Sequence, residues 1–163
     1  VGQSTGGFTD CLLQQGAAQV VGLDVGHGQL HPRLRDDPRV VCVEHINARE
    51  LQTDDARVPD AALGFDWVVG DLSFISLTLV LPALLPLLKK GGTLLMLVKP
   101  QFELQPSDIG KGGLVKDEAS YVQVEARLRE ACAVLNLNVL GYWPSAIAGG
   151  DGNKEFWIGA RRA

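Results

Sequence analysis

The sequence lacks the excess of basic charge by which many proteins hold nucleic acid. It has 15 Lys and Arg residues against 19 Asp and Glu residues, and its formal net charge is -4 at pH 7. Because phosphate contacts depend on clustered Lys and Arg, this balance argues against binding nucleic acid through bulk electrostatics alone. A nucleic-acid substrate would need a further element to hold it.

Cysteines and long apolar runs are also scarce. The three cysteines, Cys11, Cys42 and Cys132, are odd in number, widely spaced and set among apolar neighbours, which predicts buried free thiols in a reducing compartment. The longest apolar run, Leu77 to Leu88, contains two prolines and is shorter than the ~20 residues of a membrane span. We therefore expect a cytoplasmic protein without membrane contact.

The length and composition are those of one ordinary domain. With 163 residues, 46% of them hydrophobic, folding should bury roughly 70% of the surface that the unfolded chain exposes. The first eight residues form a Gly-rich turn with almost no strand before it, although such turns normally connect a buried strand to a helix. We therefore expect residues 1–163 to be one domain that is truncated at its N-terminus.

Segments typical of strands and helices alternate along the chain. Strands are predicted at 19–24, 39–44, 65–71 and 93–99, and helices at 8–15, within 25–35, at 77–88 and at 117–135. Residues 101–116 are predicted to form a long surface loop. The last two predicted strands, 138–143 and 155–160, have no helix between them, which predicts an antiparallel hairpin. This order predicts a mostly parallel, doubly wound α/β sheet that binds ligands beyond the carboxyl ends of its strands.

Two features at that edge suit a nucleoside-type cofactor. The first is the turn formed by Gly2, Ser4, Thr5, Gly6 and Gly7, whose backbone amides can approach a ligand closely. The second is Asp24 at the end of the next strand, where a carboxylate can accept hydrogen bonds from both ribose hydroxyls. Taken singly, the glycine turn could be a plain tight turn, and Asp24 could be a helix cap.

Three charged residues on separate strands suit proton chemistry at the same edge. Asp71 ends one predicted strand, Lys99 ends the next, and Glu155 begins the last. An ion pair that only holds strand ends together is the structural alternative. A lysine between two carboxylates suits the removal of a proton from a sugar hydroxyl, which is too weak an acid to react unaided.

Six motifs in order resemble one family over essentially the whole chain. They are Gly-x-Ser-Thr-Gly-Gly-Phe-Thr-Asp at 2–10, Asp-Val-Gly-His-Gly-Gln-Leu at 24–30, Asp-Leu-Ser-Phe-Ile-Ser at 71–76, Val-Lys-Pro-Gln-Phe-Glu at 98–103, Gly-Lys-Gly-Gly at 110–113 and Gly-Asn-Lys-Glu-Phe at 152–156. Together they resemble the TlyA or hemolysin A family of FtsJ-like methyltransferases.

The resemblance implies a Rossmann-like class I methyltransferase fold and methylation of ribose 2′-hydroxyls in ribosomal RNA, with S-adenosyl-L-methionine as cofactor. It also implies that ribosomal RNA or ribosomal subunits are held through an upstream RNA-binding domain. Asp71, Lys99 and Glu155 match the last three members of the family's lysine–aspartate–lysine–glutamate tetrad. The first lysine lies upstream in the family, and a fragment without it could be inactive.

The resemblance also assigns the cofactor site. Asp24 would bind the cofactor's ribose, and Asn47 its adenine, although Asn47 could equally be a helix N-cap. The methionine part would be surrounded by Gly2, Ser4, Thr5, Gly6, Gly7 and Phe8. No metal is expected, because the three histidines lack the spacing and partner residues of a metal site.

Three other functions predict different sequence features. A nicotinamide-dependent oxidoreductase would use a similar sheet, but it predicts a G-x-G-x-x-G turn, which the sequence lacks. A membrane-active hemolysin predicts an amphipathic or membrane-spanning segment, and the sequence shows neither. A non-catalytic RNA-binding module would have no need of Asp71, Lys99 and Glu155 together.

Overall fold

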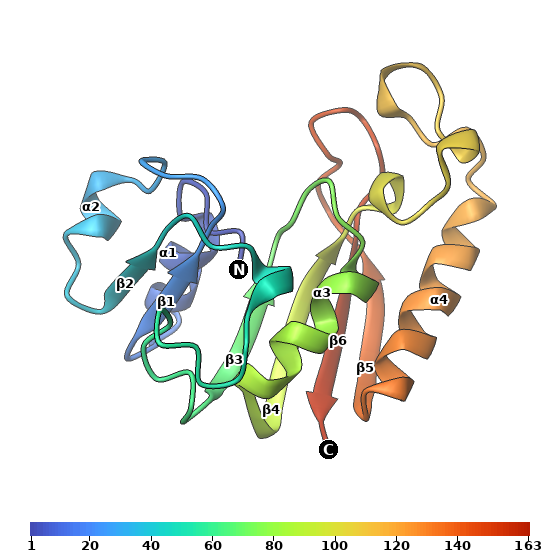
Figure 1. The fold of residues 1–163 in the computed structure, drawn as a ribbon. Coiled ribbons are helices and arrows are strands. Elements are labelled where there is room, and N and C mark those ends of the chain that lie inside the picture. Colours follow the sequence, from blue (N-terminus) through green and yellow to red (C-terminus); the bar gives the residue numbers. More distant parts are fainter.

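The computed structural model describes residues 1–163, and its strands form two sheets (Figure 1). In the smaller sheet, β1 (Val20–Leu23) pairs in parallel with β2 (Val40–Val43). The larger sheet has the order β3-β4-β6-β5, formed by β3 (Phe65–Gly70), β4 (Leu88–Val98), β5 (Leu137–Pro144) and β6 (Phe156–Arg162). β3 and β4 are parallel, whereas β6 runs antiparallel to both β4 and β5. The predicted α/β class and the closing hairpin are confirmed.

The predicted single sheet is divided, because no strand lies between β1 and β3. The first residues bridge the two sheets only at their carboxyl ends: the Val1 nitrogen donates to Val69 O at 2.7 Å, and the Gln3 amide donates to Leu23 O at 2.9 Å. Beneath this bridge lies a cavity of about 880 Å³ lined mainly by hydrophobic residues. β1 and β3 are therefore joined at one end only.

Four helices pack around these sheets: α1 (Gly7–Gln14), α2 (Pro32–Arg35), α3 (Leu77–Leu84) and α4 (Ser120–Val134). α3 and α4 lie over the same face of the larger sheet, whereas α1 lies behind β1 (Figure 1). Short 3₁₀ turns occur at Ala48–Glu50, Leu85–Leu87, Pro100–Phe102, Pro106–Asp108 and Lys111–Gly113. None of the helices is both long and apolar enough to cross a bilayer.

The main core lies between the larger sheet and its two helices. Leu94, Met96 and Val98 alternate along β4 and are completely buried, as expected for one face of a strand. They belong to the same cluster as Val124 and Leu128 of α4, which are four residues apart and therefore lie on one side of that helix. This packing fixes the carboxyl ends of β3 and β4, where the candidate catalytic residues lie.

The structure corrects three details of the sequence analysis. β4 begins at Leu88 rather than Thr93, because the Gly-rich stretch forms an irregularity in the strand, with Gly91 at φ 76°, before regular pairing resumes at Thr93. The predicted loop at 101–116 contains three 3₁₀ turns and an isolated bridge between Ile109 and Val115. All three thiols are free as predicted, but only Cys132 is buried: Cys42 is half-buried and Cys11 lies on the exposed side of α1.

Candidate active site

The structure brings Lys99 and Asp71 together at the carboxyl ends of β4 and β3. Lys99 Nζ lies 2.5 Å from Asp71 Oδ1 and donates a hydrogen bond of 3.0 Å to Ser73 Oγ. The lysine side chain is mostly buried, with 15% of its surface exposed, whereas that of Asp71 is 39% exposed. The ammonium group is thus fixed by two neighbours, in a lysine side chain that keeps a small exposed surface.

Glu155 lies near this pair without forming an ion pair with the lysine. Its carboxylate packs against Gly149, where an added Cβ would lie 3.1 Å from Glu155 Oε1. Burial raises the pKa of the Glu155 carboxyl, the charge of Lys99 lowers it, and the charge of Asp71 raises it again. The charges of Lys99 and Asp71 therefore both act on Glu155, but the ammonium group donates its hydrogen bond to Ser73 and not to Glu155.

The glycine turn lies directly against the backbone of Asp71. Gly2 has φ 71°, and a Cβ added there would lie 2.1 Å from Asp71 O. The Asp71 amide also donates to Val1 O at 3.2 Å. The two predicted parts of the site are therefore adjacent, and only a glycine permits an approach this close.

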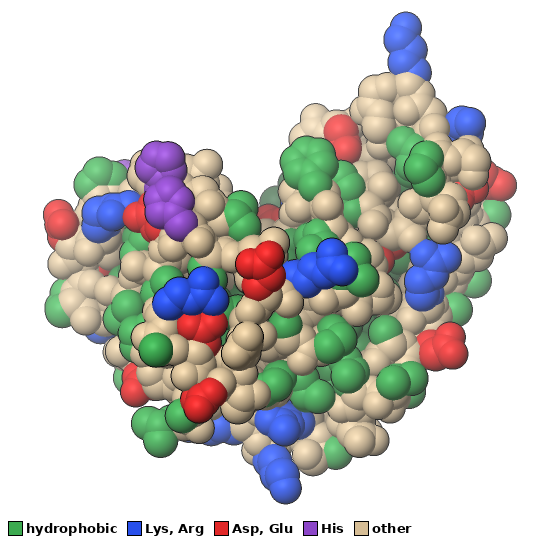
Figure 2. All heavy atoms as spheres, viewed as in Figure 1, with side chains coloured by type: hydrophobic (Ala, Val, Ile, Leu, Met, Phe, Trp, Pro, Cys, Tyr) green, Lys and Arg blue, Asp and Glu red, His purple; other side chains and the backbone are tan.

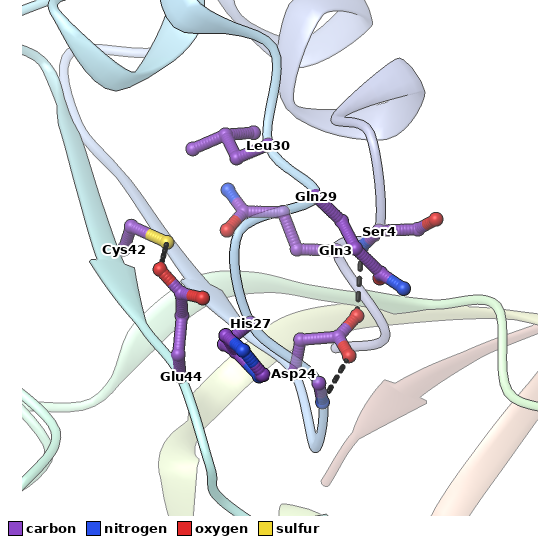
Figure 3. Close-up of a pocket in the computed structure, with 9 residues that line it drawn as sticks. Gln3, Ser4, Asp24, His27, Gln29, Leu30, Cys42 and Glu44 are labelled. Carbon is purple, nitrogen blue, oxygen red and sulfur yellow. Dashed lines mark hydrogen bonds between the residues drawn. The ribbon is translucent and has the colours of Figure 1, made fainter.

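Asp24 lines a small pocket at the end of β1 (Figure 3). Its Oδ2 accepts from the Ser4 amide at 2.7 Å and its Oδ1 from the Gly26 amide at 2.8 Å. Each carboxylate oxygen can accept more than one hydrogen bond, so acceptor capacity remains for a ligand's hydroxyls. Ser4 and Asp24 are the only predicted cofactor residues that line this pocket.

The other predicted cofactor residues lie around the turn or beyond it. Gly6, Gly7 and Phe8 lead into α1, and the Phe8 ring packs edge-to-face against Trp157 with its centroid 5.5 Å away. Thr5 contributes its carbonyl, which accepts from the His31 amide at 3.1 Å. Asn47 Oδ1 accepts from the Arg49 amide at 3.0 Å, so this side chain caps the turn at Ala48–Glu50, as its structural alternative predicted.

Glu44, which directly follows β2, closes the same pocket and was not among the predicted site residues. Glu44 Oε2 accepts from the Gly28 amide at 2.5 Å, and Oε1 pairs with Arg35 Nη2 at 2.9 Å. These bonds lower the pKa of Glu44. The only sequence signal was an acidic residue directly after an apolar strand, at the position that Asp24 occupies in the strand before it.

Phe74 is another residue that the sequence analysis missed. Phe74 is 89% exposed and its backbone is left-handed, with φ 63°, which is uncommon for a residue with a bulky side chain. The ring lies 5.0 Å from that of Phe102, and Phe74 directly follows Ser73. An exposed ring that contacts a half-buried one therefore directly follows the serine that binds the ammonium group, although the pattern of the sequence did not distinguish these rings from core residues.

The surface around the site agrees with the low net charge. Figure 2 shows a notch between the part that contains β1 and β2 and the part that contains β3 to β6, and Lys and Arg side chains are scattered over this face. No group of three or more His, Cys, Asp or Glu side chains is arranged to hold a metal ion. The site therefore offers an ammonium, carboxylates and backbone amides as its chemical groups.

Comparisons with known proteins agree on one family. The FtsJ-like methyltransferase profile matches residues 1–162. The chain is 44% identical over 161 residues to the 16S/23S rRNA (cytidine-2′-O)-methyltransferase TlyA of Mycobacterium tuberculosis, covering 98% of this chain and 58% of that protein. It is 36% identical to Hemolysin A of Brachyspira hyodysenteriae, covering 96% of this chain and 63% of the relative.

A solved structure gives the same result. A protein from Streptococcus thermophilus that carries the provisional name hemolysin superposes with a TM-score of 0.92 at 39% identity, covering 100% of this chain and 57% of that one. The chain thus spans a little over half the length of the relatives it matches. By the profile match and by these identities, the chain belongs to the FtsJ-like methyltransferase family.

Proposed function

We propose that this chain is the catalytic domain of an S-adenosylmethionine-dependent methyltransferase that modifies ribose 2′-hydroxyls of ribosomal RNA. The observation that carries the proposal is the Lys99–Asp71 pair, 2.5 Å apart, beside a glycine turn that lies against the Asp71 backbone. The name of the M. tuberculosis relative supports the choice of substrate.

The cofactor's proposed place lies between the glycine turn and Asp24. Asp24 offers carboxylate lone pairs to ribose hydroxyls, and Glu44 closes the pocket behind it. Gly2, Ser4, Thr5, Gly6, Gly7 and Phe8 surround the methionine part in this proposal, whereas Asn47 would have to give up its capping bond to reach the adenine. When bound, S-adenosylmethionine supplies a methyl group that is already activated by a cationic sulfur.

The protein's own part is to prepare the attacking oxygen. A 2′-hydroxyl beside Lys99 Nζ would have its pKa lowered by the ammonium charge, which stabilises the developing alkoxide, and the hydroxyl proton would pass to water as the oxygen takes the methyl group. Asp71 and Ser73 hold the ammonium group in place, and Glu155 adds a second negative charge nearby. Most of the acceleration then comes from alignment of the reacting atoms, which can contribute roughly 7–11 kcal/mol.

Phe74 supports a nucleoside as the substrate. Its exposed ring, paired with Phe102, offers a face on which a base can stack next to the reacting ribose, and such stacking contributes about 1–3 kcal/mol per base. Because the chain has a net charge of -4, we further propose that most RNA affinity comes from an RNA-binding domain upstream. We also propose that the whole protein works in the cytoplasm, where ribosomes are found.

The proposal is tested with the full-length polypeptide, ribosomal subunits and S-adenosylmethionine. Nucleosides from the digested RNA are analysed by mass spectrometry, and binding of S-adenosylhomocysteine and of NAD is measured by calorimetry. We expect a 2′-O-methylated nucleoside and binding of S-adenosylhomocysteine alone. Binding of NAD alone, or a methyl group on a base instead of a ribose, would refute the proposal.

A further inference from the structure

Glu103 is a buried carboxylate that the proposed chemistry does not use. Only 5% of its surface is exposed, although ionisable side chains are rarely buried without partners. It lies at the end of the Val-Lys-Pro-Gln-Phe-Glu motif, four positions after Lys99. A group of this kind needs a structural or functional reason for its burial.

The carboxylate of Glu103 holds the turn that follows β3, residues 71–76, which we name the Ser73 turn. Glu103 Oε2 accepts from Ser76 Oγ at 2.5 Å, and Oε1 accepts from the Leu77 amide at 2.8 Å. The backbone of Glu103 is itself fixed from the other side, because Arg127 of α4 donates to its carbonyl. The carboxylate therefore joins the segment after β4 to the end of the Ser73 turn.

The residues of the Ser73 turn need such a support. Phe74 is held at φ 63° with its ring in solvent, and a strained backbone persists only where the surroundings fix it. Ser73, the residue before it, receives the hydrogen bond from Lys99. Apart from the contacts of Asp71 and Ser73 with Lys99 and the bond of Asp71 to Val1, the Glu103 carboxylate supplies the main polar anchor of this turn.

We propose that Glu103 is a positioning residue for methyl transfer, whose carboxylate ties the Ser73 turn to the Lys99 segment and so keeps Ser73 and Phe74 in register with the ammonium group. The inference rests on the proposed function, which it deepens. Burial raises the pKa of the Glu103 carboxyl, while the bonds from Ser76 and Leu77 oppose that rise, as expected for a desolvated acceptor of two hydrogen bonds.

The experiment compares three variants of the full-length polypeptide. Glu103→Ala removes the carboxylate. Glu103→Gln can preserve both contacts: the glutamine oxygen accepts from the Leu77 amide, and its NH2 group donates to Ser76 Oγ. Ser76 can become the acceptor because its hydroxyl lies 2.8 Å from that of Thr78 and can donate to it instead. Val124→Ala is the matched control, since Val124 is fully buried in α4 and lies outside the Ser73 turn.

Hydrogen exchange of a peptide that covers residues 71–77 is measured first, because it does not depend on activity. We expect exchange to become about tenfold faster in Glu103→Ala and to remain unchanged in Glu103→Gln and Val124→Ala. If Glu103→Ala does not fold, Ser76→Ala removes half of the anchor and should give a smaller change in the same peptide. Unchanged exchange in the variant that folds would overturn the proposal.

Methyl-transfer kinetics are measured second. A loss of alignment of about 1 Å can lower a rate about a hundredfold, so we expect kcat of Glu103→Ala to fall by about tenfold to a hundredfold, with the KM for S-adenosylmethionine unchanged and kcat restored in Glu103→Gln. Equal losses of kcat in Glu103→Ala and Val124→Ala would show a general stability effect and contradict the inference. Absence of methyl transfer in the wild type would refute the proposed function instead, and the exchange measurement would still test the anchor.

Discussion

Gly2 is the position where one added methyl group should separate the two halves of the site. A Cβ at Gly2 would lie 2.1 Å from Asp71 O, whereas side-chain carbons are essentially never found closer than 3.0 Å, so Gly2→Ala must push the glycine turn away from Asp71 by about 1 Å. The backbone there has φ 71°, which costs a residue with a Cβ about 1–2 kcal/mol more than glycine. Overpacking adds about 1–3 kcal/mol.

We therefore expect Gly2→Ala to lower the free energy of unfolding by about 2–5 kcal/mol, which lowers the melting temperature by about 5–15 °C in a protein of this size. Where the protein still folds, the displaced turn should lower the methyl-transfer rate by up to about a hundredfold. Thermal unfolding and single-turnover kinetics of the full-length polypeptide measure the two effects.

Gly7→Ala is the matched control, because it lies in the same turn. A Cβ at Gly7 meets nothing within 4 Å, and Gly7 is the first residue of α1, where alanine is favoured over glycine by roughly 0.5–1 kcal/mol. Gly7→Ala should therefore leave stability unchanged or slightly raised. If Gly2→Ala is as stable as Gly7→Ala, the argument for a required close approach between the turn and Asp71 is refuted.

Three further predictions follow from other residues of the site. Phe74→Ala should lower kcat/KM for RNA, because the base would lose about 1–3 kcal/mol of stacking free energy, and should leave the affinity for S-adenosylhomocysteine unchanged. An unaltered kcat/KM would count against a base at this ring. Asn153→Ala should lower the free energy of unfolding by about 1–3 kcal/mol, because Asn153 is buried and bonds Val115 N and Gly113 O; chemical denaturation measures the loss, and wild-type stability would contradict the role. Since the folded-state pKa of Glu103 is raised above its ordinary 4.5, its contribution is fully present below pH 4.5 and lost as the pH rises through the folded value. The stability of the wild type relative to Glu103→Gln should therefore fall as the pH rises from about 4, and a constant difference would show that the carboxyl is not shifted.

Hydrophobic periodicity was enough to predict most of the fold. β4 and α4 carry strong patterns, with Leu94, Met96 and Val98 alternating on the strand and Val124 and Leu128 spaced along the helix. α4 forms within its predicted range, and β4 covers nearly all of its predicted range but begins earlier, at Leu88. The division into two sheets could not be predicted in this way, because it depends on which strands lie side by side. A pattern along the chain gives elements but not their neighbours.

The candidate site was predictable where one side chain ends a strand. Lys99 and Asp71 end adjacent parallel strands, so their contact follows from topology. Ser73, Phe74 and Glu44 were missed because their positions depend on local backbone geometry, such as the left-handed conformation of Phe74. Asn47 was included among the predicted site residues but caps a 3₁₀ turn. A polar residue after a strand can serve either role, and the sequence does not distinguish them.

The single-turnover rate of methyl transfer after Lys99→Ala tests the role of the Lys99 ammonium group most directly. Lys89→Ala is the control, because Lys89 lies near the start of β4 and pairs with Asp66 at 3.3 Å on the surface. We expect Lys99→Ala to lower the rate by about 10²–10⁴-fold while S-adenosylhomocysteine binds as in the wild type, and Lys89→Ala to leave both unchanged. A Lys99→Ala enzyme that transfers methyl groups at the wild-type rate would contradict the account.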